Sequence, residues 1–224
     1  MKEAVQYIKE ELGGLYRPSE ISSFIRHIFD HTGNYSRMIA EPDRNVTTTE
    51  KEKIYNIVKR LRNYEPIQYI LGETDFYGLR LSMKKGVFIP RPETEELVQW
   101  IISSIDTRSP SILDIGTGSG CIALALKKNI RKALVSGVDI SKFALNTARE
   151  NALINDLSVN FYLADIMNWE KYSWDRYDLI VSNPPYVREM GKTEMSDNIL
   201  KFEPENAIFV PDEDPLIFFR VSAR

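Results

Sequence analysis

The chain has 224 residues, of which 43% are hydrophobic and 27% charged, and its formal net charge is −3. This composition is typical of a folded globular protein and excludes a broadly basic surface for nucleic acid, because basic side chains do not outnumber acidic ones either after residue 72 or over the whole chain. A single Cys excludes an internal disulfide, and no apolar run reaches the roughly 20 residues of a membrane span or the core of a signal peptide. We therefore expect a monomeric, cytoplasmic protein that binds neither membranes nor nucleic acid directly.

The first 72 residues predict helices only. Apolar side chains recur at helical spacing in three stretches, and a shorter helix is expected between the second and the third; the four lie at residues 4–12, 21–29, 35–40 and 54–61. Thr47 with Glu50, and Thr49 with Glu52, each match a capping box ahead of the last stretch. A final turn starts at Pro66 and ends at Gly72. We interpret residues 1–72 as an N-terminal helical bundle.

Residues 73–92 predict a β-hairpin linker, because the sequence from Phe76 to Leu81 alternates around Gly78 and two prolines stiffen the end of the segment. A helix is expected over 93–105. From residue 111 onwards, short β-branched runs alternate with helical patterns, which is typical of a parallel α/β sheet. The expected strands are 111–115, 133–138, 159–163 and 179–182, with helices at 121–128 and 142–153.

Four parallel strands are few for a doubly wound domain. The apolar stretch from Pro215 to Val221 predicts the start of a helix with nothing after it to cover. We therefore expect residues 93–224 to form an α/β domain that is truncated at its C-terminus, with one side of the fourth strand unpaired.

A glycine-rich turn follows the first strand of the expected sheet, in the sequence Asp114-Ile115-Gly116-Thr117-Gly118-Ser119-Gly120. Glycines at such a turn let the backbone bend tightly and approach a ligand. The dinucleotide fingerprint G-x-G-x-x-G would need glycine at position 121, which is Cys121, expected here as a small core residue. The turn therefore favours a nucleoside without a pyrophosphate, such as S-adenosylmethionine, with an ordinary glycine-rich turn as the alternative.

Acidic residues close the next two strands. Asp139 lies near the spacing at which a carboxylate binds ribose hydroxyls in related folds, although an exposed Asp at a strand end is common. Asp165 is placed to accept a hydrogen bond from an adenine amino group, with Ile166 beside it to pack on the ring; helix capping is its alternative role. A glycine turn and two aspartates at three consecutive strand ends together predict a nucleoside site.

The fourth strand ends in Asn183-Pro184-Pro185-Tyr186. Two prolines cannot continue a sheet, so the chain leaves it in a stiff, extended conformation. The Asn183 side-chain oxygen and the Pro184 carbonyl can accept both hydrogens of a planar amino or amide nitrogen, and Tyr186 can pack on the acceptor. This arrangement favours methyl transfer by positioning, since a sulfonium needs no base before attack. The alternative is a proline-terminated strand with a core Tyr.

Taken together, these residues resemble the PrmC/HemK family of release factor glutamine methyltransferases. The matching segments are Glu65–Gly72, Phe88–Glu95, Ile112–Ala123, Asn183–Tyr186 and Phe202–Pro204 with Ala207 after it. The sequence Ile-Pro-Arg-Pro-Glu-Thr-Glu at 89–95 is the most specific of them. The resemblance implies a helical bundle that helps dock the release factor, a β-hairpin linker and a class I (Rossmann-like) S-adenosylmethionine-dependent methyltransferase domain that lacks the family's last strands.

The implied reaction moves a methyl group from S-adenosylmethionine to the side-chain amide nitrogen of the Gln in the Gly-Gly-Gln loop of a peptide chain release factor. By the same resemblance, the residues that bind the cofactor are Gly116, Thr117, Gly118, Ser119, Gly120, Asp139, Asp165 and Asn183. Those implied to contact the glutamine or line its site are Asn183, Pro184, Pro185, Tyr186, Arg91 and Thr94. No metal is expected, because His27 and His31 have no suitably spaced third ligand.

Two other functions stay open at this point. An adenine methyltransferase acting on nucleic acid would use the same planar acceptor, but it predicts a basic, aromatic-rich region that the charge counts do not show. A truncated chain that keeps cofactor binding without turnover is the other alternative.

Overall fold

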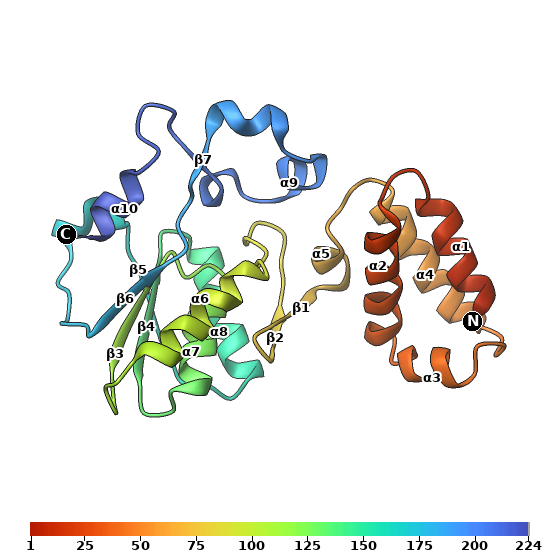
Figure 1. Ribbon diagram of the computed structural model, residues 1–224, viewed down its shortest axis with the longest axis horizontal. Coiled ribbons are helices and arrows are strands. Elements are labelled where there is room, and N and C mark those ends of the chain that lie inside the picture. Colours follow the sequence, from red (N-terminus) through yellow and green to blue (C-terminus); the bar gives the residue numbers. More distant parts are fainter. Residues whose placement is uncertain (224) are drawn as a thin grey trace. The chain divides into compact units, whose positions relative to one another are not determined.

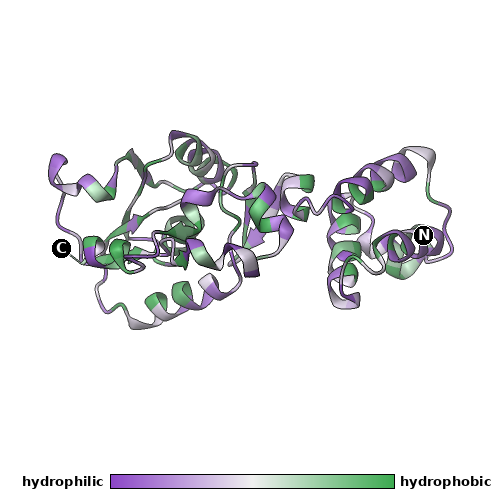
Figure 2. Cartoon of the chain, turned by 90° about the horizontal axis from the view of Figure 1, so that it is seen from above, coloured by the Kyte–Doolittle hydropathy of each residue, from purple (hydrophilic) through white to green (hydrophobic). Residues whose placement is uncertain are grey.

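The computed structural model describes residues 1–223, and the chain divides into two compact units, Met1–Gly72 and Glu73–Arg224 (Figure 1). The first unit is helical and contains α1 (Lys2–Leu12), α2 (Pro18–His31), α3 (Tyr35–Ala40), α4 (Thr48–Leu61) and α5 (Ile67–Leu71). Their apolar sides meet in one core, and Figure 2 shows hydrophobic and hydrophilic residues on opposite sides of these helices. The apolar spacing predicts α1, α2 and α4, while α3 and α5 match the short helix expected at 35–40 and the turn expected from Pro66 to Gly72.

One of the two capping boxes predicted for α4 forms. The Glu50 N–H donates to Thr47 Oγ1 at 3.3 Å, and the Thr47 N–H donates back to the Glu50 carboxylate at 2.8 Å. The alternative box of Thr49 with Glu52 is wrong, because α4 has already begun at Thr48. Gly72 ends the unit with φ of 75°, the left-handed conformation of a helix C-cap.

The second unit starts with a hairpin of β1 (Glu73–Phe76) and β2 (Leu79–Ser82), followed by α6 (Glu93–Ser104). Tyr77 and Gly78 form the two-residue turn, both with positive φ, as a type I′ turn requires. The central sheet contains β3 (Ser111–Ile115), β4 (Leu134–Asp139), β5 (Asn160–Leu163) and β6 (Leu179–Ser182). All four are parallel, as predicted, in the order β5-β4-β3-β6.

The two faces of this sheet are covered differently. On one face, α6, α7 (Cys121–Asn129) and α8 (Lys142–Ile154) pack with the hairpin over a large apolar core that includes Ile112 and Val181. The opposite face carries a small cluster around Leu113 and Ile115, covered by side chains that follow β5. Within residues 1–223, β6 pairs only with β3, so its other edge is unpaired, as expected from the sequence.

Besides β6, the chain after β5 folds into short elements that the sequence pattern does not predict, apart from the apolar helix near the end. They are η1 (Ile166–Lys171), β7 (Val187–Arg188), η2 (Glu189–Glu194), α9 (Asp197–Phe202), η3 (Glu205–Ala207), β8 (Phe209–Val210) and α10 (Ile217–Ser222). β7 and β8 pair in parallel and so bring the segment after α9 back to the end of β6. None of the helices described in residues 1–223 combines the length and apolarity needed to cross a bilayer.

The strand order fixes where a ligand can bind. From β3 the chain adds β4 and then β5 on one side, and it returns to place β6 on the other side of β3 (Figure 1). Such a reversal of strand order leaves a crevice beyond the carboxyl ends of the two strands that flank it. The glycine-rich turn after β3 and Asn183 after β6 both face this crevice.

Gly137 in β4 packs closely against the glycine-rich turn, so a substitution at this position tests the described packing. A Cβ at this position would lie 2.8 Å from Thr117 Oγ1 and 2.9 Å from two ring carbons of Phe161. We expect Gly137→Ala to lower the free energy of unfolding by about 1–3 kcal/mol, measured by chemical denaturation, because the packed neighbours must shift. Gly191→Ala is the control, since its Cβ would meet only Val187 Cγ1 at 3.4 Å. Equal stability of the two variants would contradict this packing argument.

Candidate active site

The glycine-rich turn forms the floor of the site. Gly116, Gly118 and Gly120 have φ angles of 70°, 56° and 81°, which residues with a Cβ adopt only under strain. The N–H groups of Gly116 and Thr117 both donate to the Val138 carbonyl at 2.9 Å. These bonds fasten the turn to β4 in a conformation that only glycine at these positions permits.

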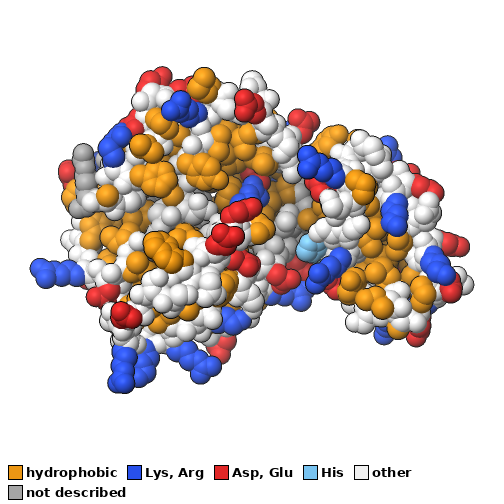
Figure 3. Space-filling view, viewed as in Figure 1, with side chains coloured by type: hydrophobic (Ala, Val, Ile, Leu, Met, Phe, Trp, Pro, Cys, Tyr) orange, Lys and Arg blue, Asp and Glu red, His pale blue; other side chains and the backbone are white. Residues whose placement is uncertain are grey.

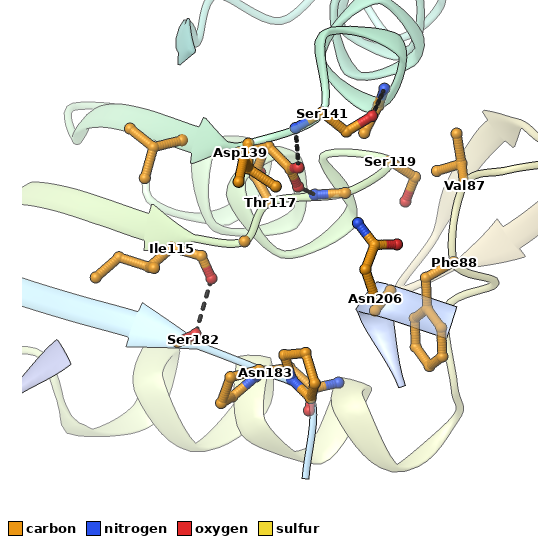
Figure 4. Close-up of a pocket in the computed structure, with 18 of the residues that line it drawn as sticks. Val87, Phe88, Ile115, Thr117, Ser119, Asp139, Ser141, Ser182, Asn183 and Asn206 are labelled. Atoms are coloured by element: carbon orange, nitrogen blue, oxygen red, sulfur yellow. Dashed lines mark hydrogen bonds between the residues drawn. The ribbon is translucent and has the colours of Figure 1, made fainter. Parts of the chain in front are cut away.

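Asp139 is held at the end of β4 by two backbone donors. The N–H groups of Gly118 and Ser141 donate to its two carboxylate oxygens, each at 2.8 Å (Figure 4). Burial raises the pKa of Asp139, and this effect outweighs the lowering by the N–H donors. A carboxylate has about four lone-pair directions, so each oxygen can still accept from a ligand hydroxyl.

Asp114 lies beneath the turn, fully buried at the middle of β3. Its Oδ2 accepts from Thr117 Oγ1 at 2.6 Å and from the Ala123 N–H at 3.2 Å, while Oδ1 has no partner among residues 1–223. Burial raises the pKa of Asp114 to about 7, against the lowering effect of the Thr117 and Ala123 donors. This residue ties the turn to the first turn of α7 and was not singled out from the sequence.

Asp165 and Ile166 lie at the end of β5, where the sequence predicts them. The Asp165 carboxylate accepts from the Met167 N–H at 3.0 Å and from Asn168 Nδ2 at 2.6 Å, so it does cap η1. Both Asp165 and Ile166 also line the cavity described below. The capping alternative and a place at the ligand site are therefore compatible.

Asn183 leaves β6 with its amide fixed from one side. Its Nδ2 donates to Thr94 Oγ1 at 3.1 Å, and Thr94 is buried in the first turn of α6. No hydrogen bond to Asn183 Oδ1 comes from the described residues, which leaves this oxygen as an acceptor. Pro184 is buried behind it, whereas Tyr186 is 64% exposed, so the alternative of a core Tyr is wrong.

Two neighbouring cavities lie at this site among residues 1–223. The one called the larger cavity has a volume of about 260 Å³ and opens at the carboxyl ends of the strands (Figure 4). It brings together eleven of the predicted site residues: Thr94, Gly116, Thr117, Gly118, Ser119, Asp139, Asp165, Ile166, Asn183, Pro184 and Pro185. Gly120 is not among its lining residues and packs against Ala148 of α8 instead. A smaller cavity of about 160 Å³ adjoins it and is lined in part by Arg91, Asn183, Pro184 and Tyr186.

Several lining residues were missed from the sequence. Ile140 and Ser141 follow Asp139 directly, so the reasoning applied to Ile166 could have found them. A further group comes from the segment before α6 and from the chain after α9: Val87, Phe88, Pro90, Pro204, Asn206 and Ala207. Phe88, Pro90, Pro204 and Ala207 belong to the segments that resemble the family, which is the signal that could have found them. Cys121 also lines the larger cavity, where burial raises the pKa of its thiol to about 12.

The polar and apolar groups that line the larger cavity fit S-adenosylmethionine. Ser119 Oγ is buried in its lining without a hydrogen-bond partner among the described residues, an open polar position that a ligand can fill. Asp139 and Asp165 offer acceptors at the ends of adjacent strands, with the apolar side chains of Ile140 and Ile166 beside them. Carboxylate acceptors beside apolar side chains suit an adenosyl group, which has hydroxyl and amino donors and a flat apolar ring.

The fold and this site define a class I S-adenosylmethionine-dependent methyltransferase, and the family model "Methyltransferase small domain" matches residues 79–204. A second model, "PrmC N-terminal domain", matches residues 3–72. The release factor glutamine methyltransferase of Flavobacterium psychrophilum is 41% identical over 217 residues, covering 94% of this chain and 76% of the relative. That of Bacteroides thetaiotaomicron is 43% identical, covering 98% and 80%. The chain belongs to the release factor glutamine methyltransferase family.

Among solved structures, a tRNA (uracil-54, C5)-methyltransferase of Pyrococcus abyssi shares 24% identity with a TM-score of 0.42. The likeness covers 50% of this chain and 27% of that one. It is too low to bear on the assignment.

Asp114 predicts a specific pH dependence of stability. Its folded-state pKa of about 7 exceeds the unfolded value near 3.9, so between these values the folded protein binds more protons at this group than the unfolded chain does. Through this group, the free energy of unfolding falls as the pH rises from about 4 to 7. We expect Asp114→Asn to gain on the order of 1–3 kcal/mol relative to wild type between pH 5 and pH 8, measured by urea denaturation. Asp106→Asn, at an exposed position, is the control. A difference in free energy of unfolding between Asp114→Asn and wild type that does not change with pH would contradict the raised pKa of Asp114.

Proposed function

We propose that this protein transfers a methyl group from S-adenosylmethionine to the side-chain amide nitrogen of the Gln in the Gly-Gly-Gln loop of a peptide chain release factor. The observation that carries the proposal is the Asn183 amide, whose nitrogen donates to Thr94 at 3.1 Å and which lines both cavities. The family to which the chain belongs supports glutamine as the acceptor. The two cavities supply separate places for the donor and the acceptor.

An amide nitrogen is a poor nucleophile, because its lone pair is delocalised into the carbonyl. Asn183 Oδ1 and the Pro184 carbonyl oxygen can accept its two N–H hydrogens and so fix its direction. Thr94 keeps the Asn183 oxygen, and not its NH₂ group, turned toward the acceptor. The two prolines hold both acceptors on a stiff stretch of backbone, so the amide is positioned without movement of the chain.

S-adenosylmethionine, when bound, supplies a methyl group on a sulfonium that is a good leaving group. Asp139 and Asp165 would hold the adenosyl side of the cofactor, and Ser119 would meet one of its polar groups. Phe88, Pro90 and Ala207 line the larger cavity with apolar surface that keeps water away from the reaction centre. Positioning of this kind can lower a barrier by roughly 7–11 kcal/mol.

No protein base is needed before the attack. Methyl transfer leaves a surplus proton on the acceptor nitrogen, which is lost to bulk solvent when the methylated product leaves the site. The two carboxylates that line the larger cavity, Asp139 and Asp165, are already engaged by N–H donors and hold the cofactor. Proton removal therefore follows the methyl transfer and places no demand on a titratable side chain.

The smaller cavity suits the acceptor chain. Its lining is mostly apolar, with Arg91 as the one cation among its lining residues, and Tyr186 stands 64% exposed beside it. We assign Arg91 and Tyr186 to contacts with the release factor around the glutamine. The helical bundle of residues 1–72 contributes further docking surface, and the protein acts as a monomer in the cytoplasm, where release factors work.

The proposal is tested with labelled S-adenosylmethionine offered to a purified release factor, to the same factor with its loop Gln changed to Ala, and to a nucleic acid in separate tubes. Label is expected on the unaltered release factor alone. Label on the nucleic acid, or on the altered release factor, would overturn the proposed acceptor.

Asn183→Ala tests the positioning mechanism. We expect kcat to fall by at least about 10³-fold, while affinity for S-adenosylhomocysteine stays within a few-fold, because only the acceptor loses its orienting oxygen. Thr94→Val should lower kcat by about tenfold, since it removes only the hydrogen bond that orients Asn183. Asn146→Ala, on the exposed side of α8, is the control and should behave as wild type. Near-normal transfer by Asn183→Ala would contradict the mechanism.

A further inference from the structure

A buried carboxylate joins two distant segments at the rim of the site. Glu203 follows α9, and its side chain is only 2% exposed. One carboxylate oxygen accepts from the Ile89 N–H at 3.2 Å, and the other pairs with Arg91 Nη2 at 2.5 Å. The Arg91 guanidinium also lies 4.6 Å from the centre of the Phe88 ring. Glu203 therefore holds Ile89 and Arg91 directly, and it reaches Phe88 through the Arg91 guanidinium.

The two segments that Glu203 joins build the walls of both cavities. The segment before α6 supplies Val87, Phe88 and Pro90 to the larger cavity, and the segment after α9 supplies Pro204, Asn206 and Ala207. Figure 4 shows Phe88 and Asn206 on the same side of the larger cavity. Phe88 and Ala207 also line the smaller cavity, so one wall serves both.

Glu203 itself lines neither cavity, so it cannot touch a ligand in either. A buried ion pair contributes little net stability, because desolvation of the charges offsets their attraction. Arg91, moreover, keeps 32% of its side chain exposed. The contacts of Glu203 are thus better explained by the geometry they impose than by the stability they add.

We propose that Glu203 is a positioning residue for the methyl transfer: it holds Ile89 and Arg91 so that the Phe88 ring keeps a fixed place in the wall shared by the two cavities. This proposal rests on the proposed function. A fixed ring keeps the donor and the acceptor amide aligned at Asn183, which both cavities also share. Because positioning supplies most of the catalysis here, a small shift of this wall lowers kcat steeply.

The test uses the full chain with Glu203→Gln, Arg91→Gln and the double variant. Glu203→Gln keeps an acceptor for the Ile89 N–H but loses the charge that holds Arg91. We expect it to lower kcat by about 10–100-fold, to weaken S-adenosylhomocysteine binding by about fivefold, and to leave Tm within about 3 °C. The double variant should be no worse than the more damaging single variant, since both changes open the same contact.

Glu205→Gln is the matched control, because it removes an exposed carboxylate two residues away that pairs with Lys192 at 3.1 Å. It should keep wild-type kcat and binding. Wild-type kcat in Glu203→Gln, additive losses in the double variant, or a fall in Tm that alone accounts for the lost activity would each overturn the proposal. If the wild-type protein methylates no release factor, the proposed function fails, and S-adenosylhomocysteine binding unchanged by Glu203→Gln would separately overturn the positioning role.

Discussion

The site depends on the pairing of β6 with β3. In this register Ile115 lies opposite Ser182, and the Ser182 hydroxyl donates to the Ile115 carbonyl at 2.8 Å. The residues that follow are then Gly116 on one strand and Asn183 on the other, so the turn proposed to bind the cofactor begins beside the group proposed to orient the acceptor. A shift of one residue would turn every side chain of β6 to the opposite face of the sheet. The strand register is thus the first determinant of the reaction geometry.

The polar groups of the site are held in place before any ligand arrives. Asp139 is fixed by two backbone N–H groups, the glycine turn by the Val138 carbonyl, and Asn183 by Thr94. Each contact joins elements that the apolar core already brings together. The conformational entropy of these side chains is therefore lost during folding and not during ligand binding. A ligand that meets groups already in place loses less free energy to their immobilisation. Buried Asp114, with one oxygen lacking a partner, shows that the turn is kept in this conformation at some cost in stability.

The parts of the molecule that the sequence could predict are those with a local pattern. Helical spacing and β-branched runs located the bundle and the central strands, and parallel strands necessarily bring Asp139 and Asn183 to one edge. Apart from the apolar helix α10, the chain after β6 could not be predicted, because two-residue strands and 3₁₀ turns have no period to detect. The contact of Glu203 with Ile89 spans 114 residues, and no local feature of either residue encodes it. Phe88 lies in a segment that resembles the family, but its place in the cavity wall could not be predicted, because the distant segment after α9 completes that wall.

The chemistry of the acceptor explains why the site is made mainly of backbone, proline and amide groups. A base strong enough to ionise an amide would be hard to maintain beside a sulfonium, because the fixed positive charge lowers the pKa of a neighbouring base. Fixing the nitrogen in line with the methyl group avoids that conflict and needs only neutral acceptors. Water is the competing nucleophile in such a site, and it has no amide plane for Asn183 and Pro184 to recognise. Selectivity therefore comes from the shape of the Asn-Pro-Pro stretch and the apolar wall opposite it, and both are properties of the folded chain before the substrate binds.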